Sequence, residues 1–269
     1  MQLVLRKMSS KKFRKLSMHI LIKDEKAIKK IAVAGNIIYE IFSAIDKMDL
    51  NSMQTIELND KIDTMIKAHR ATPAFLDYRG FPKSCCISLN NEVVHGIPDD
   101  RKIQKGDLVK IDVGVIYQDY IADAAKTFAV GNIPDDVKKL LAVTRKALEK
   151  GIEMAKKGNR ISDISRSVQT TVEENGFSVV RELTGHGVGI SLHEEPIIPN
   201  FIGSGADPVI KPGMVFAIEP MVNIGGYDVI TAENGWTIKA KDGSLSCHYE
   251  DTIAILEKGN INLTRVVGS

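Results

Sequence analysis

Carboxylates stand inside apolar, strand-like stretches of this 269-residue chain, at positions where the surrounding pattern predicts burial. Glu219 lies in the run Ala-Ile-Glu-Pro-Met, and Glu250 lies in His-Tyr-Glu-Asp-Thr-Ile. Burying an unpaired charge in such a segment costs several kcal/mol. The fold must therefore bring a neutralising cation to these positions, and this requirement constrains the chain more than any other feature.

Five residues able to bind a metal follow one another in the order acid, acid, histidine, acid, acid. Four carboxylates and one imidazole make a mostly oxygen site, which suits two hard or borderline divalent ions better than one structural zinc. The glycines on both sides of the histidine leave room for the backbone to approach the ions, and their spacing fits neither a phosphate loop nor a dinucleotide turn. The predicted ligands are Asp112, Asp123, His186, Glu219 and Glu250.

Composition narrows the class of protein. At 43% apolar residues the chain can bury one sizeable core, and a net charge of +2 points neither to nucleic acid nor to an anionic membrane. We find no secretory signal and no apolar run of membrane-spanning length. The three cysteines (Cys85, Cys86 and Cys247) form no CxxC pattern, so neither a disulfide framework nor a zinc ribbon is indicated. We expect a cytoplasmic protein with no membrane contact.

The first 23 residues differ from the rest, because they contain seven basic residues and no acidic one. Three interpretations are open: a flexible, solvated tail, a contact with ribosomal RNA or another polyanion, and an organelle transit peptide. We predict a flexible basic extension over residues 1–21 and a single catalytic domain over residues 22–269.

Apolar spacing predicts helices over residues 24–46, 134–157 and 161–175, and a further helix that Asn51 or Ser52 would cap. A β-type run covers residues 85–89, and a hairpin turning at residues 117–119 would hold Asp112 and Asp123. The last third of the chain is rich in strand patterns.

An internal echo relates the two halves of the chain. Asp112 lies six residues after the turn glycine Gly106, and Glu219 lies six residues after Gly213. A second carboxylate follows on a later strand in each half. We interpret the chain as two similar αβ halves that face each other, each supplying two carboxylates to a shared centre.

Two more histidines, His95 and His193, stand near the predicted ligands. Each alone would be an ordinary structural histidine. Beside a metal centre they become candidates for polarising a carbonyl and for guiding a proton to a leaving group. Glu194 and Glu195, which follow His193, are interpreted as a solvated or capping pair and not as ligands.

Six ordered motifs make the chain resemble the type I methionine aminopeptidases from about Ile22 to its C-terminus. The resemblance implies an α+β pita-bread fold, in which pseudo-two-fold αβ halves share a central curved antiparallel sheet with helices on its outer face. A dinuclear site would lie at the concave centre. The motifs are 94–99 (VHGIPD), 111–113 (IDV), 185–189 (GHGVG), 193–196 (HEEP), 218–221 (IEPM) and 249–252 (YEDT).

The resemblance also implies roles. Two divalent ions (Co, Mn, Fe, Zn or Ni) would be held by Asp112 on one ion, by His186 and Glu219 on the other, and by Asp123 and Glu250 as bridges. Glu219 would be the general base for a metal-bridging water that attacks the first peptide bond. His193 would stabilise the oxyanion, and His95 would assist at the scissile nitrogen.

Members of this family remove the initiator methionine from new chains when the second residue is small. The implied partners are the N-termini of nascent polypeptides, with a transient ribosome contact through the basic N-terminus, and we expect a monomer. An apolar pocket for the methionine thioether is required. Phe75, Phe81 and Leu192 stand where many bacterial members have cysteine, tyrosine and phenylalanine. The pocket positions implied by the motifs are Phe75, Tyr78, Phe81, Cys86, His95, Leu192, His193 and Trp236.

Two other readings compete with this one. Proline-specific aminopeptidases and prolidases share the fold and all five ligands, but they usually carry an additional N-terminal domain. Other relatives use the fold without metal, as creatinases or as binding modules for RNA or protein. The intact ligand set argues against this second group.

Overall fold

A computed structural model describes residues 19–265 of the chain. The predicted basic extension of residues 1–21 therefore lies outside the described residues except at its last three positions. Lys23, which we had counted with the basic segment, belongs to the folded part and is 4% exposed. Within residues 19–265, every helix is too short or too polar to cross a bilayer.

The first half of the chain contributes two helices and the hairpin predicted from the sequence. Asp24 starts the first helix by accepting a hydrogen bond from the amide of Ala27 at 2.7 Å, and Ile31, Ile38 and Ile41 form its buried face. The elements are α1 (Glu25–Ile45), α2 (Thr55–Ala68), β1 (Thr72–Pro73), the short 3₁₀ turn η1 (Tyr78–Gly80), β2 (Cys86–Leu89), β3 (Glu92–Val94), β4 (Leu108–Tyr117) and β5 (Tyr120–Ala129).

The second half begins with two helices and continues as short strands, as the sequence predicted. Its elements are α3 (Asp135–Met154), α4 (Ile161–Glu173), β6 (Ser178–Val179), β7 (Thr184–Gly187), β8 (Glu194–Pro199), β9 (Val215–Ile218), β10 (Met221–Asn223), β11 (Val229–Thr231), β12 (Ile238–Ala240), β13 (Ser246–His248), β14 (Asp251–Ile255) and β15 (Asn260–Asn262).

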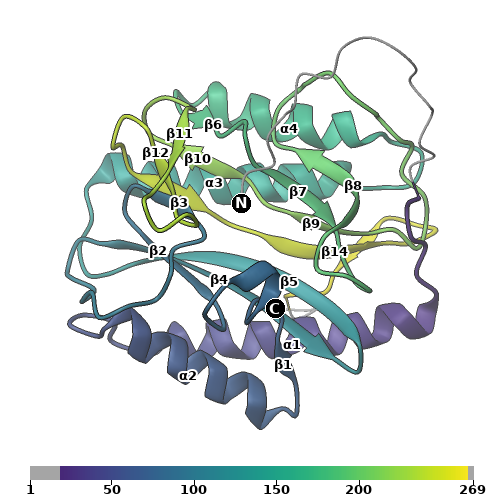
Figure 1. Ribbon diagram of the computed structural model, residues 1–269. Coiled ribbons are helices and arrows are strands. Elements are labelled where there is room, and N and C mark those ends of the chain that lie inside the picture. Colours follow the sequence, from purple (N-terminus) through teal and green to yellow (C-terminus); the bar gives the residue numbers. More distant parts are fainter. Residues whose placement is uncertain (1–18, 266–269) are drawn as a thin grey trace.

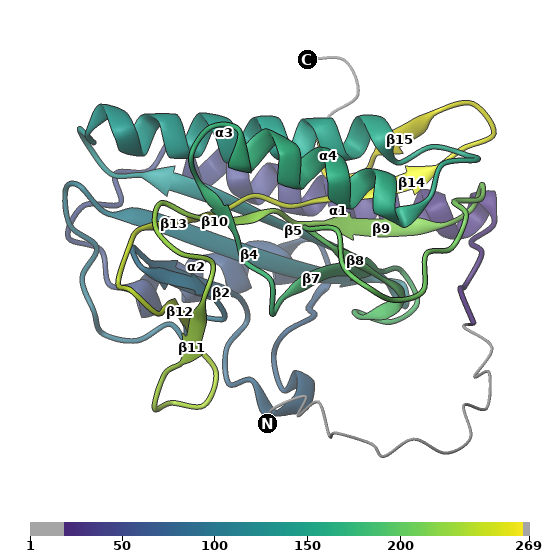
Figure 2. The same cartoon turned by 90° about the horizontal axis from the view of Figure 1, so that it is seen from above.

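Antiparallel strands form one layer and helices form another. The sheet of the first half contains β1, β4 and β2, with β5 paired to β4, and the main sheet of the second half has the order β15-β14-β9-β7-β8. A bridge between Ala125 and Glu250 joins them. The two halves lie one above the other in Figure 1, and Figure 2 shows α1, α3 and α4 together on one side of the strands. The predicted α+β architecture with outer helices is confirmed.

Two threonine hydroxyls form hydrogen bonds between the two halves where their sheets meet. Thr252 Oγ1 of β14 donates to the carbonyl of Asp123 at 2.7 Å and accepts from its amide at 3.0 Å. Thr127 Oγ1 of β5 does the same for His248, at 2.7 Å and 3.0 Å. Each half thus fixes the backbone of a residue that the other half presents to the centre.

The start of α2 differs from the prediction. The helix begins at Thr55, and the Glu57 carboxylate accepts from the amide of Gln54 at 3.0 Å. Ser52 has a φ of +70° and Asn51 precedes it in a turn, so neither residue caps the helix. The sequence Gln-Thr-Ile-Glu carries the acid of a capping box three residues after the cap residue, and glutamine is uncommon at that cap position.

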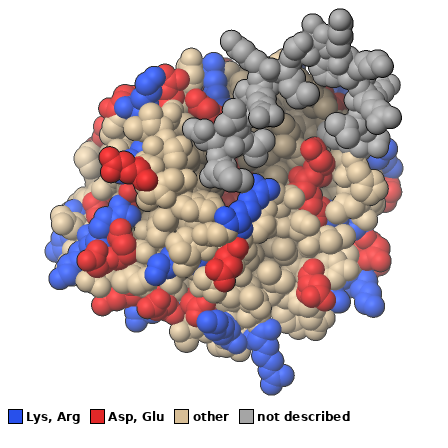
Figure 3. Space-filling model, in the orientation of Figure 1, with Lys and Arg blue, Asp and Glu red and all other residues tan. Residues whose placement is uncertain are grey.

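Charged side chains of both signs are interspersed on the face shown in Figure 3. This distribution agrees with the near-balance of 36 basic and 34 acidic residues along the chain. The described residues on this face therefore form no one-sided basic surface of the kind that binds nucleic acid.

We expect the three thiols to be unreactive in the folded protein. Cys85, Cys86 and Cys247 are free and buried. Burial raises the pKa of the first two well above its usual value and that of Cys247 to about 11, so little nucleophilic thiolate forms. Ellman's reagent at pH 8 should label none of them within minutes and all three after denaturation in urea. Rapid labelling of the native protein would contradict this burial.

Candidate metal centre

The β4–β5 hairpin places Asp112 and Asp123 on the same face of the sheet. Asp112 pairs with Ala125, and Gly114 pairs with Asp123. Side chains two residues apart on a strand, and those directly across a strand pair, point to the same side, so the two carboxylates are diagonal neighbours. Gly114 has no side chain opposite Asp123, and a Cβ there would lie 2.6 Å from Cε1 of Phe75. The ring of Phe75 occupies that space instead.

Strands of the second half bring the other three predicted ligands to the same place. His186 of β7 pairs with Ala217 of β9, and Glu219 follows β9 directly. The Asn200 side chain donates to the carbonyl of Glu219 at 2.9 Å. Glu250 is brought to the group by its β-bridge to Ala125 of the first half. The structure thus brings all five predicted ligands around one cavity.

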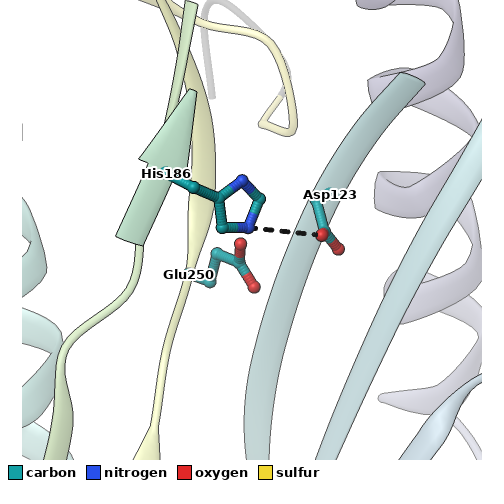
Figure 4. A group of neighbouring side chains, drawn as sticks. All are labelled: Asp123, His186 and Glu250. Atoms are coloured by element: carbon teal, nitrogen blue, oxygen red, sulfur yellow. Dashed lines mark ion pairs between the residues drawn. The ribbon is translucent and has the colours of Figure 1, made fainter. Parts of the chain in front are cut away.

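The distances within this group suit a cation. His186 Nε2 lies 3.6 Å from Glu219 Oε1 and 3.9 Å from Asp123 Oδ2. These distances exceed those of hydrogen bonds, whereas ligand atoms about 2.0–2.2 Å from one ion lie roughly 3 to 3.6 Å apart. Figure 4 shows His186, Asp123 and Glu250 pointing toward one another from different strands, and their ligand atoms lie within 4.8 Å of each other.

Burial makes the apo site electrostatically unfavourable. It raises the pKa of Asp123 to about 7, and burial together with neighbouring carboxylates raises the pKa of Asp112, Glu219 and Glu250 well above the usual range. Burial also lowers the pKa of His186 to about 4, so its imidazole is neutral and able to ligate. Asp112 Oδ1 and Asp123 Oδ1 are buried without a hydrogen-bond partner among the described residues. Divalent cations would remove both penalties.

One residue of the centre was missed from the sequence. His248 ends β13, is 1% exposed, and lies with Nε2 3.5 Å from Glu219 Oε2 and 4.0 Å from Glu250 Oε2. The signal was available, because His248 stands two residues before Glu250 in the same strand-like run and so falls on the same side of the chain.

Apolar side chains form one wall of the cavity, whose volume is about 160 Å³. Phe81 and Trp236 pack edge to face with ring centroids 5.2 Å apart. Arg79, which the sequence did not suggest, also lines the cavity and is exposed. The predicted pocket residues found in the lining are Phe75, Tyr78, Phe81, Cys86, His95, Leu192, His193 and Trp236.

His193 and His95 flank the ligand group. The Tyr78 hydroxyl lies 2.9 Å from His193 Nδ1, and the rings of His193 and His186 have centroids 4.3 Å apart. Burial lowers the pKa of His193 to about 3 and that of His95 to about 4. Both imidazoles are neutral at pH 7, so each can donate from one nitrogen and accept at the other.

Glu194 corrects our reading of the pair that follows His193. Its side chain is 3% exposed and forms a buried ion pair with Lys23, so it is not solvated. Its Oε1 accepts from the amides of Ile190 and Ser191, at 2.6 Å and 2.8 Å. Glu195 is exposed, as predicted. Glu194 therefore folds the loop that carries Leu192 and His193, a role that no local sequence pattern reveals.

Comparison with known proteins gives a consistent result. The model of metallopeptidase family M24 matches residues 29–257. A methionine aminopeptidase of Clostridium perfringens is 45% identical over 92% of this chain and 99% of its own length. The crystal structure of methionine aminopeptidase from Rickettsia prowazekii covers 92% of this chain with a TM-score of 0.89 and 39% identity, and the match spans 100% of that structure.

Prolidases are more distant. A prolidase structure from Thermococcus sibiricus matches 92% of this chain at 27% identity and a TM-score of 0.74, but the match covers only 61% of the prolidase. The similarity thus extends over nearly the whole length of the methionine aminopeptidases and over about three fifths of the prolidase. The predicted pita-bread fold is confirmed, and the chain belongs to metallopeptidase family M24 and, within it, to the methionine aminopeptidases.

Proposed function

We propose that this protein is a metal-dependent aminopeptidase that removes the initiator methionine from nascent proteins when the second residue is small. The observation that carries the proposal is the cavity, where an apolar wall faces the buried ligand group. A methionine side chain fits the apolar wall, and its scissile amide would then lie beside the ligand group.

We propose two divalent ions as the cofactor. Asp112, Asp123 and Glu250 would hold one, and Asp123, His186, Glu219 and Glu250 the other, so that two carboxylates are shared. The orphaned oxygens of Asp112 and Asp123 support this assignment. Mixed oxygen and imidazole donors accept Co, Mn, Fe, Zn or Ni. When bound, such ions lower the pKa of a coordinated water and polarise a carbonyl.

Glu219 is the residue best placed to hold the proton released in hydrolysis. Its carboxylate is buried beside the ligand group, and burial with the charge of Asp123 raises its pKa. A carboxylate whose proton affinity is raised is a stronger base than a solvated one. It would accept the proton of the attacking water and pass it on as the amide bond breaks.

Tyr78 and His193 would stabilise the negative charge on the substrate carbonyl. If the Tyr78 hydroxyl donates to His193 Nδ1, across their 2.9 Å contact, the ring proton sits on Nε2. That N–H can then donate to the oxyanion. His95, also in the cavity lining, would hold the leaving amine by hydrogen bonding at the scissile nitrogen.

The decisive experiment compares peptides that separate the competing substrate classes. Purified protein with added Co, Mn or Fe should release free methionine from Met-Ala-Ser and Met-Gly peptides. It should release much less from Met-Lys-Ser, because the second side chain is large, or from Ala-Ala-Ser, because the pocket is left empty. Cleavage of Xaa-Pro peptides instead, or no metal-dependent release, would overturn the proposal.

Replacing Tyr78 by phenylalanine tests the oxyanion assignment. The ring and its stacking on His193, at a centroid distance of 5.4 Å, are kept, while the hydroxyl is lost. Losing one hydrogen bond in a donor chain is worth about 1 kcal/mol, so kcat should fall roughly five- to tenfold. KM for Met-Ala-Ser should change little. A larger rise in KM than fall in kcat would place Tyr78 in substrate binding instead.

We also propose that the enzyme meets its substrates in the cytoplasm, at the ribosome, through the basic segment before residue 22. The support is compositional, since that segment carries six basic residues and no acidic one. Deleting residues 1–19 should reduce cosedimentation with ribosomes at low salt while release of methionine from short peptides is preserved. Unchanged cosedimentation would rule out this contact.

A further inference from the structure

His248 is held with its ring toward the metal centre by contacts on both sides of its backbone. Its amide donates to Thr127 Oγ1 at 3.0 Å, and its carbonyl accepts from the same hydroxyl at 2.7 Å. Across the strand, His248 pairs with Met221, which lies two residues after Glu219. This register keeps the imidazole beside the Glu219 carboxylate.

Neither ring nitrogen of His248 has a hydrogen-bond partner among residues 19–265, although the side chain is 1% exposed. A buried imidazole without partners is costly, since burial removes the hydrogen bonds that water would supply. The carboxylate oxygens of Glu219 and Glu250, at 3.5 Å and 4.0 Å from Nε2, form no hydrogen bond with the ring. The ring therefore has an unmet capacity to bind, and Nε2 is the atom that faces other polar groups.

His248 and His186 have similar surroundings, and each lies near a different oxygen of the Glu219 carboxylate. His186 Nε2 lies 3.6 Å from Glu219 Oε1, and His248 Nε2 lies 3.5 Å from Glu219 Oε2. Each ring also has a second carboxylate near it: Asp123 at 3.9 Å from His186, and Glu250 at 4.0 Å from His248. The ligand atoms of Asp123, His186 and Glu250 lie within 4.8 Å of one another, and so do those of Glu219, His248 and Glu250.

We propose that Glu219, His248 and Glu250 form a third cation position, which binds a borderline divalent ion such as zinc more weakly than the two positions of the proposed active centre. We call it the His248 position. Zinc binds both imidazole nitrogen and carboxylate oxygen, and three protein ligands suffice for a site with an open position. The weaker affinity follows from charge, because two divalent ions already neutralise the four carboxylates and a third would make the centre positive.

Occupancy of the His248 position would inhibit the enzyme. The ion would use Glu219 Oε2, and since Oε1 faces the His186 side, no free oxygen would remain to accept the proton of the attacking water. This step rests on the proposed function, whereas ion binding at the position does not. Excess zinc would therefore act as a reversible inhibitor through His248, and manganese, which prefers oxygen donors, would do so much less.

Ion counting tests the position independently of catalysis. Native mass spectrometry of the full chain in excess zinc should show three ions in the wild type and two in His248→Gln. His69→Gln is the matched control, because His69 is an exposed histidine 3.3 Å from Glu40, and it should keep three. The same ion count in the wild type and His248→Gln would overturn the proposal.

Two further measurements test the His248 position, and the first of them does not depend on the folding of His248→Gln. In the wild type itself, a third equivalent of Co²⁺ should add a paramagnetically shifted imidazole resonance to the one that His186 gives with the first two equivalents. In Met-Ala-Ser hydrolysis, the zinc concentration for half-inhibition should rise about tenfold or more in His248→Gln, as expected for a lost ligand. Absence of the second imidazole signal refutes the position. Equal half-inhibition with three bound ions refutes only its inhibitory role.

Discussion

Replacing Glu219 by glutamine is expected to lower kcat/KM for Met-Ala-Ser by about three orders of magnitude. General base catalysis by a positioned carboxylate contributes about 10²- to 10⁴-fold, and an amide cannot accept the proton. The side chain is buried beside Asp123 and His186, so no water can readily replace it as a base. Steady-state release of methionine, measured at saturating metal, gives the value.

Metal content separates loss of the base from loss of the ions. Asp123, His186 and Glu250 still form a compact ligand group in the Glu219→Gln variant, so we expect it to retain at least one ion by elemental analysis. Glu195→Gln, at an exposed position of the neighbouring motif, is the control and should keep wild-type activity. A Glu219→Gln enzyme with more than a tenth of wild-type kcat/KM would remove Glu219 from the role of base.

Replacing Lys23 by methionine is expected to destabilise the protein by about 3–5 kcal/mol, the usual cost of removing one partner of a buried ion pair. The Lys23 ammonium is bonded to the Glu194 carboxylate, and their side chains are 1% and 3% exposed. Without it, Glu194 would be a buried charge held only by two backbone amides. Urea unfolding followed by fluorescence measures the change.

Surface ion pairs provide the comparison for Lys23. Lys29 also pairs with an acid, Glu25, but both side chains are exposed, so Lys29→Met should cost less than about 0.5 kcal/mol. The double variant Lys23→Met/Glu194→Met should be more stable than Lys23→Met alone, since no buried charge is left. The pair is not coupled if the double variant loses as much unfolding free energy as Lys23→Met and Glu194→Met lose together. The packing of the Lys23 stem would then explain the loss.

The Lys23 pair should also affect catalysis through His193. Glu194 follows His193 directly, and its carboxylate folds the 190–194 loop back on itself. A Cβ at Gly189 would lie 2.9 Å from Cε of Lys23, so the lysine stem packs closely against the start of this loop. In Lys23→Met we expect kcat to fall more than KM rises, because the loop carries His193, the proposed oxyanion donor, and only Leu192 of the apolar wall of the cavity.

The positions of the proposed ligands could be picked out from the sequence because the signal at each one is local. A carboxylate within an apolar strand pattern is conspicuous at any position in a sequence. Such patterns surround Asp112, Asp123, Glu219 and Glu250. The helices were predictable for a similar reason, since three- and four-residue apolar spacing is a property of each segment alone. The β4–β5 hairpin was predicted from its polar turn residues Gln118 and Asp119, and both have positive φ in the structure.

Three features of the structure were not predicted, and the first two depend on residues far apart in the chain. Glu194 is 171 positions from Lys23, and nothing near Glu194 distinguishes a buried ion-pair partner from a solvated acid. His248 was missed because a single histidine in a strand is usually structural, and its significance lies in its distance to Glu219 across the β10–β13 register. The start of α2 was missed because its cap residue is a glutamine.

The hydrogen bonds that Thr127 and Thr252 form between the two halves determine when the site can assemble during synthesis. Thr127 and Thr252 each lie more than 120 positions from the residue to which they are hydrogen-bonded. Neither contact can form until the second half of the chain has been synthesised. Contacts of such separation form late in folding. During its own synthesis this protein would therefore assemble its centre only near the end of translation, after residues 248 and 252 have been added to the chain.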